Sequence, residues 1–386
     1  MSSKCLPLVT PLNLSAAEKV AQFREMRILH PRLIELESQL MAAVADSPRN
    51  SIIYVYGPSG VGKSTLKEKA ENRVRRESAQ ELATDNDRIA LVSVEAPSPD
   101  SGHFSWREHF KAILECLDEP LIDLRKDRNG LKLSPRLLVA ARENARIAVG
   151  AYQTSVVNAL KYRKPVALFA DEAQHIAKVT SGRRLVDQLD VIKSIANGSN
   201  TPHVLIGTYE LLGLRNLNGQ AARRSLDLHF GRYRADVEAD AIAFRDVVDS
   251  FAKRLPFEEP PDLLQVWDFL YERSIGCIGI LKDWLARALS HALRDAAPTL
   301  RVNHLQSTAL SMSKVDKLLI ECITGESRLA EIDDDRKHLR IRMGLDREEQ
   351  AQKSASKRSQ DANSRKSFQR IPKRDPIGIE APTGNA

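Results

Sequence analysis

The sequence is poor in cysteine and lacks any long apolar run. Its four cysteines, Cys5, Cys116, Cys277 and Cys322, show no C-x-x-C or histidine-rich pairing. Neither a zinc site nor a disulfide framework is therefore indicated, and reduced thiols in a cytoplasmic protein are the simplest interpretation. No apolar run approaches ~18 residues, and the N-terminus lacks a basic region followed by an apolar core. We therefore expect neither a membrane span nor a secretory signal.

Net charge is also missing from most of the chain. The formal net charge is +7, and residues 336–386 alone carry 13 Lys and Arg against 6 Asp and Glu. Residues 1–335 carry 45 of each sign, so net charge does not establish nucleic-acid binding. The composition of residues 345–386 predicts a disordered basic tail. Three interpretations stay open: an arm that holds DNA, a peptide that docks on a partner, or a solubilising tail.

The most informative stretch runs from Ile52 to Leu66 and contains the motif Gly57-x-x-x-x-Gly62-Lys63-Ser64 between an apolar run and a helix-compatible segment. Glycines let backbone N–H groups approach phosphate oxygens, and the N-terminus of the following helix attracts the same anion. Lys63 is predicted to reach the β- and γ-phosphates, and Ser64 to bind Mg²⁺. The predicted nucleotide-binding residues are Gly57, Pro58, Ser59, Gly60, Val61, Gly62, Lys63, Ser64 and Thr65.

A second motif, Val166 to Glu172, is an apolar strand pattern that ends in two carboxylates. Parallel strands present their carboxyl ends to a common crevice, so both side chains should reach the nucleotide. Asp171 is predicted to hold Mg²⁺, and Glu172 to act as the general base on the attacking water. The alternative is an acidic residue that only begins a helix. The phosphate loop upstream favours the catalytic interpretation.

Strand and helix patterns alternate along the first two thirds of the chain. Strands are expected at 52–56, 89–95, 166–170, 202–207 and 227–230. This order predicts an α/β P-loop fold with a parallel five-stranded sheet and helices on both faces. The expected domains are an N-terminal helical extension, the nucleotide-binding domain, an all-α lid and the tail, at residues 1–50, 51–236, 237–344 and 345–386.

The order of these parts resembles the AAA+ ATPases. The resemblance implies that Thr208, at the tip of a strand, is the sensor 1 residue. It implies that Arg223 or Arg224 reaches the nucleotide of a neighbouring subunit, with Arg232 as a weaker candidate. It also implies that Lys282 is the sensor 2 residue, where arginine is more usual. The predicted catalytic residues are therefore Lys63, Glu172, Thr208, Arg223, Arg224 and Lys282.

Within that superfamily the chain resembles the transposition regulators of the TniB/TnsC type. The resemblance is carried by GPSGVGKSTL, LFADEAQHI, VLIGTYEL, the Arg-Arg pair ahead of LHFGRY, and GCIGILKDWL. It implies a protein that binds ATP and Mg²⁺ and forms homo-oligomeric rings or helical filaments on double-stranded DNA. Such a protein links a target-selection protein to a transposase.

Direct support for DNA contact comes from four basic residues after the second predicted strand: Arg107, Lys111, Lys126 and Arg128. Cations at such positions would neutralise DNA phosphates with little base readout. A solvated charged surface is the alternative, since 28 % of the residues are charged. Two other functions stay open, a signalling or scaffold NTPase that does not act on DNA and a helicase-loader-like ATPase.

Overall fold

The computed structural model describes residues 14–99, 104–119, 135–177, 183–215, 225–329 and 333–345. The chain divides into two compact units, residues 1–326 and 327–386. All five strands and most of the described helices belong to the first unit, and helix α16 belongs to the second. The domain boundaries given above stay predictions.

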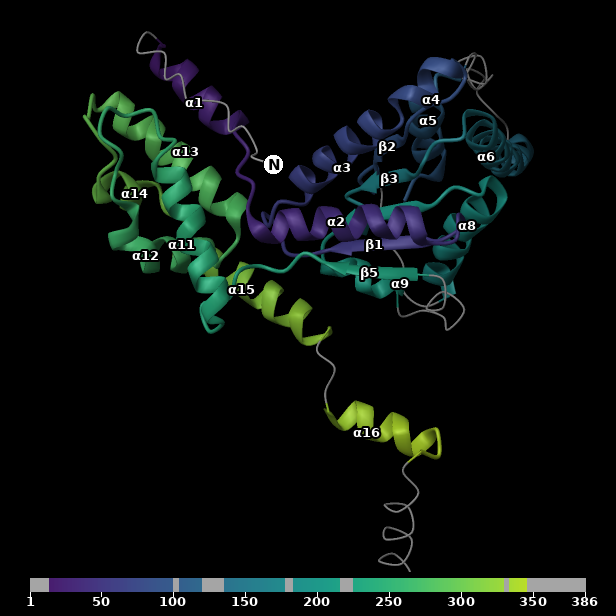
Figure 1. Ribbon diagram of the computed structural model, residues 1–386. Helices are drawn as coiled ribbons and strands as arrows, with labels where there is room; N and C mark the ends of the chain where they lie inside the picture. The colour runs from purple at the N-terminus through teal and green to yellow at the C-terminus, as the bar shows by residue number, and fades with distance from the viewer. Residues whose placement is uncertain are drawn as a thin grey trace, which may run out of the picture. The chain divides into compact units, whose positions relative to one another are not determined.

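Five parallel strands form one sheet in the order β2-β3-β4-β1-β5, as Figure 1 shows. The predicted P-loop sheet is thereby confirmed. The register pairs Tyr56 with Gly207 on one side and with His229 on the other, and pairs Glu95 with Asp171. The carboxyl ends of neighbouring strands therefore lie level at one edge. The strands are β1 Ile52–Tyr56, β2 Val92–Glu95, β3 Leu168–Asp171, β4 His203–Gly207 and β5 Ser225–His229.

The helices follow the strands and then form a helical region of their own. None of those in the described residues is both long and apolar enough to cross a membrane. They are α1 Ala16–Glu25, α2 Pro31–Asp46, α3 Lys63–Glu77, α4 Ala79–Thr84, α5 Trp106–Cys116, α6 Pro135–Arg163, α7 Gln174–Ala177, α8 Arg183–Ser199, α9 Leu212–Arg215, α11 Glu238–Ala252, α12 Trp267–Ser274, α13 Ile278–Arg294, α14 Val302–Thr308, α15 Met312–Ser327 and α16 Asp333–Arg342, with 3₁₀ turns η2 Tyr209–Leu211 and η3 Leu263–Val266.

Local chemistry explains where several helices begin. Ser15 and Glu18 form a reciprocal capping box at α1, with the Glu18 carboxylate accepting the N–H of Ser15 at 2.8 Å. The hydroxyl of Ser105 accepts the N–H of Glu108 at the start of α5. Pro31 occupies the first turn of α2, where a missing N–H costs nothing. These starts agree with the sequence signals.

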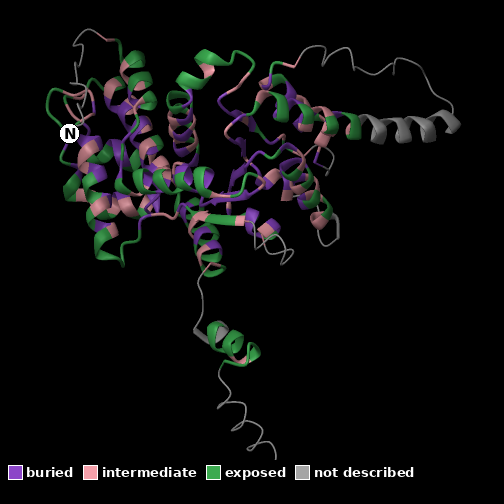
Figure 2. Ribbon diagram, turned by 45° about the vertical axis from the view of Figure 1, so that its right-hand side comes forward, coloured by how far each residue is buried: buried purple, intermediate pink, exposed green. Residues whose placement is uncertain are grey.

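Both faces of the sheet are buried. Ile53, Val55 and Val204 pack in one cluster with residues of α2 and α3. Tyr54 and Leu205 belong to the alternate residues that point to the opposite face, and they are 0 % and 1 % exposed. In Figure 2 the central strands are purple, the colour of buried residues, whereas β5 at the sheet edge is mostly exposed or half-buried.

A second hydrophobic core lies within the helical region. It is built mainly on α11 and α13, and the N-terminal segment contributes Phe23 and Ile28 to it. Trp284 is 0 % exposed, and its indole N–H donates to the Leu305 carbonyl at 3.0 Å. Helix α1 therefore packs on the helical region even though it is far away in sequence.

The buried histidines predict a dependence of stability on pH. Burial lowers the pKa of His203 to about 4, and its Nδ1 lies 2.9 Å from the Thr201 carbonyl. The unfolded imidazole takes up a proton near pH 6.5, so between that pH and about 4 the unfolded state binds one more proton than the folded state. His203 should therefore remove up to about 1.4 kcal/mol of stability per pH unit as the pH falls through this window.

His203→Asn removes the titration and keeps a donor for Thr201. Urea unfolding of this variant should show a shallower loss of stability between pH 6.5 and 4.5 than the parent. The difference measured at pH 7.5 gives the intrinsic cost of the substitution. Parallel curves for the two proteins would refute the assignment.

Candidate functional site

The phosphate loop connects β1 to α3 and depends on three glycines. Gly60 and Gly62 have φ of +75° and +117°, a backbone region that residues with a Cβ rarely adopt. Gly57 is needed for close approach, because a Cβ there would lie 2.1 Å from the Phe230 carbonyl oxygen. The N–H of Gly57 donates to the Gly207 carbonyl at 3.3 Å, which joins the loop to the end of β4.

Lys63 is the first residue of α3 and is 9 % exposed. Its ammonium donates to the carbonyls of Gly57 and Pro58 at 3.0 and 2.8 Å, so it lies within the curve of the loop. Burial lowers the pKa of Lys63, and the charges of Glu172 and Asp171 oppose that shift. The predicted phosphate-binding lysine is therefore close to both predicted carboxylates. Ser64, which follows it, is exposed.

Asp171 ends β3 and is 8 % exposed. One carboxylate oxygen accepts the N–H of Glu172 at 2.9 Å, and the other lies 3.1 Å from the Lys67 ammonium. Glu172 has φ of +50°, an uncommon value for a residue other than glycine and typical of a constrained turn.

Gln174 joins Glu172 to Thr208. Its amide NH₂ donates to the Glu172 carboxylate, and its carbonyl oxygen accepts the N–H of Thr208 at 3.2 Å. The Thr208 hydroxyl is buried and has no hydrogen-bond partner within the part of the chain that the structure describes. The sequence-predicted Lys63, Asp171, Glu172 and Thr208 thus occupy one edge of the sheet, while Gln174 was not predicted.

The start of helix α13 rests directly on the phosphate loop. The N–H of Gly279 donates to the Gly60 carbonyl at 2.7 Å, and a Cβ on Gly279 would lie 2.5 Å from the same oxygen. Ile280 packs equally close, since a Cβ on Gly60 would lie 2.6 Å from its Cγ1. Small residues on both sides therefore allow backbone-to-backbone contact.

A small cavity, here called the linker cavity, lies between the loop, α13 and the segment that joins α1 to α2. Its volume is about 50 Å³. Lys282 lies at this cavity, and its ammonium donates to the Arg24 carbonyl at 2.6 Å, while burial lowers its pKa. The sequence prediction missed this cavity, although the apolar residues before His30-Pro31 are a usable signal. The lining residues are Met26, Arg27, Ile28, His30, Leu33, Val61, Gly62, Thr65, Phe251, Ile278, Gly279 and Lys282.

Two of the predicted arginines, Arg223 and Arg224, lie outside the described residues. Arg232 is described and is engaged within the chain. Its guanidinium donates to both carboxylate oxygens of Glu326 on α15, at 2.9 and 3.2 Å, and to the Tyr271 hydroxyl at 3.3 Å. In this arrangement it holds α15 against the end of β5.

The predicted DNA-binding residues divide in the same way. Arg107 and Lys111 lie one turn apart on α5, and both are half-buried. Lys126 and Arg128 lie outside the described residues.

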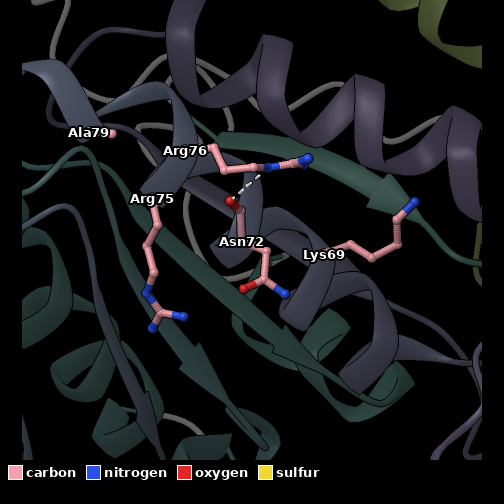
Figure 3. A pocket seen from close by; sticks show the side chains of 5 residues that line it. All are labelled: Lys69, Asn72, Arg75, Arg76 and Ala79. Carbon is pink, nitrogen blue, oxygen red and sulfur yellow. Dashed lines mark hydrogen bonds between the residues drawn. The ribbon is translucent and has the colours of Figure 1, made fainter.

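A larger cavity of about 590 Å³ lies along α3, and Figure 3 shows the side chains that line it. Its basic residues are engaged locally: Lys69 pairs with Glu37, and Arg75 pairs with Glu71 on its own helix. The Nε of Arg76 donates to the Asn72 carbonyl, the dashed line in the figure. The cavity is separate from the phosphate loop and we assign it no role.

The parallel sheet order and the phosphate loop define an AAA+ P-loop fold. Residues 47–214 match the sequence family described as an AAA domain. This segment runs from just before β1 to the end of the described part of α9 and includes the phosphate loop, Asp171, Glu172 and Thr208. A search of curated proteins gave no match.

Solved structures share the fold at low sequence identity. The Aeropyrum pernix ORC1 protein in complex with DNA has a TM-score of 0.51 and 19 % identity, over 75 % of this chain and 67 % of that chain. The Aeropyrum pernix ORC2 protein in ADPNP–ADP complexes has 0.48 and 15 %, over 75 % and 72 %. Drosophila ORC bound to DNA has 0.43 and 15 %, over 80 % and 68 %.

The contact between Gly60 and Gly279 gives a stability prediction. Gly279→Ala should lower the free energy of unfolding by about 1–3 kcal/mol, because the new methyl group meets backbone that cannot turn aside. Gly150→Ala is the matched control, since a Cβ there meets nothing within 4 Å and should stabilise α6 by about 0.5–1 kcal/mol. Thermal unfolding compares them. Equal stabilisation by both substitutions would exclude the close contact.

Proposed function

We propose that this protein binds and hydrolyses ATP, and that several copies assemble with ATP on double-stranded DNA to regulate transposition. In that role it links a target-selection protein to a transposase. The observation that carries the enzymatic part is the convergence of Lys63, Asp171 and Glu172 at one edge of the sheet, directly beside the loop glycines.

Binding of ATP follows from groups already in place. The loop N–H groups and the Lys63 ammonium would bind the phosphates, with Lys63 exchanging its two loop carbonyls for phosphate oxygens. The linker cavity offers Ile28 and Phe251 to the adenine ring. At about 50 Å³ it is far smaller than the ~150 Å³ cavity that accepts benzene, so the start of α13 must move outward as the base enters.

Hydrolysis would use Glu172 as the general base. The oxygen of a water molecule bonds to the γ-phosphorus, the bond from that phosphorus to the ADP oxygen breaks, and the Glu172 carboxylate takes the proton of the water. The Thr208 hydroxyl, buried without a partner among the described residues, is suited to the attacking water or to a γ-phosphate oxygen.

The donor set at the loop also suits Mg²⁺, since it offers the exposed Ser64 hydroxyl and the Asp171 carboxylate. The ion would supply positive charge to the phosphates. For Asp171 to bind it, Lys67 must give up the contact that it makes with this carboxylate.

The DNA and transposition parts of the proposal rest on the motif resemblance and on the basic pair of α5. A replication-initiator type of ATPase is the second candidate, because the ORC1 protein that shares this fold was solved in complex with DNA. A transposase gene beside the gene for this protein would favour the first candidate, and a replicative helicase as the bound partner would favour the second.

Two substitutions separate binding from hydrolysis. Lys63→Ala should weaken binding of a fluorescent ATP analogue at least about tenfold, since a charge-assisted contact is lost. Glu172→Gln should keep binding and lower the hydrolysis rate by ~10²–10⁴. Lys69→Ala, on the same helix but paired with Glu37, is the control and should match the parent. Parental hydrolysis by the Glu172→Gln variant would remove Glu172 as the base.

DNA binding is tested by gel shift on random duplex DNA with a non-hydrolysable ATP analogue. We expect a shift that needs the analogue and weakens steeply with added salt. Lys111→Ala with Arg107→Ala should weaken it uniformly across sequences, whereas Arg73→Ala, whose side chain pairs with Glu77, should not. No shift at low salt would exclude the DNA part of the proposal and leave a nucleotide-driven scaffold.

A further inference from the structure

We propose that Gln174 is a positioning residue for ATP hydrolysis, whose side-chain amide holds the Glu172 carboxylate at the tip of β4. The inference rests on the proposed hydrolysis of ATP and adds a residue that the motif analysis gave no role. Gln174 does not itself touch the reacting atoms. It acts through Glu172.

Gln174 is buried, with 3 % of its surface exposed, and both ends of its amide are engaged. The NH₂ group donates to the Glu172 carboxylate, and the carbonyl oxygen accepts the Thr208 N–H at 3.2 Å. The two contacts determine the orientation of the amide, because a carboxylate needs a donor and a backbone N–H needs an acceptor. The reversed amide would set like groups against each other at both ends.

The backbone around Gln174 is shaped to allow this bridge. A Cβ on Gly207 would lie 2.3 Å from the Gln174 carbonyl oxygen, so only glycine allows the amide to come this close. The N–H of Ala173 donates to the Ile206 carbonyl at 2.9 Å, which joins the turn after β3 to β4. Glu172, held at φ of +50° in this turn, is therefore tied to β4 through backbone and side chain together.

The bridge has a chemical consequence for the base. A donor on the carboxylate favours its ionised form and limits its rotation, and a base needs both properties. The bridge also connects Glu172 to the residue that bears the partnerless Thr208 hydroxyl. Groups on the two strand tips, β3 and β4, are thereby kept in one relative position.

Two nearly isosteric substitutions test this role. Gln174→Met keeps the length of the side chain and loses both hydrogen bonds. Gln174→Glu keeps the shape and sets a second carboxylate beside Glu172, and two such groups favour sharing a proton. Gln39→Met, on the exposed side of α2, is the control. The measurements are binding of a fluorescent ATP analogue and single-turnover hydrolysis between pH 5.5 and 9.

We expect Gln174→Met to bind the analogue within about threefold of the parent and to hydrolyse ATP ~10–100-fold more slowly. Gln174→Glu should be slow at low pH and regain rate as the pH rises, with its acid limb ~1–2 pH units above that of the parent. Parental rates in both variants, or an equal loss of binding and rate at every pH, would overturn the positioning role.

The Glu172→Gln variant in the same assay keeps this inference separate from the proposed function. If it hydrolyses ATP as fast as the parent, the proposed function fails at its base, and the positioning role fails with it. If it is slow while both Gln174 variants match the parent, only the inference about Gln174 fails.

Discussion

The hydrogen bond from the Gly57 N–H to the Gly207 carbonyl joins the ends of β1 and β4, and the site depends on that junction. It brings the start of the phosphate loop level with the strand tip that bears Thr208. Both glycines lack a Cβ where another group needs the space, the Phe230 carbonyl at Gly57 and the Gln174 amide at Gly207. The parallel register then brings Asp171 to the same edge. The catalytic arrangement therefore follows from strand order and from two close backbone approaches.

The helical region makes the site responsive to what it binds. Its core includes Phe23 and Ile28 from the N-terminal segment, so that segment and α13 are packed together beside the linker cavity. The single backbone contact between Gly60 and Gly279 joins this assembly to the loop. A nucleotide base that widens the cavity would shift both elements together, because they share one core. Arg232 and Glu326 give a second connection, from the end of β5 to α15.

Much of the fold could be predicted from the sequence because buried strands and loop glycines leave local signals. Runs such as IIYVY and HVLIG are continuous in apolar residues because both faces of the sheet are covered. The linker cavity could not be predicted in this way, since its walls come from three segments far apart in the chain. The role of Gln174 depends on a neighbour 34 positions away, and periodicity carries no information on such pairs. The ammonium of Lys282, expected at the γ-phosphate, instead contacts the Arg24 carbonyl because α1 packs on α13.

Electron microscopy of the full chain with duplex DNA and a non-hydrolysable ATP analogue tests the central claim most directly. The expected result is a nucleotide-dependent assembly with triphosphate density on the loop between Gly57 and Ser64 and with Glu172 facing the γ-phosphate. Triphosphate density elsewhere, or particles of unchanged size with and without the analogue, would contradict it.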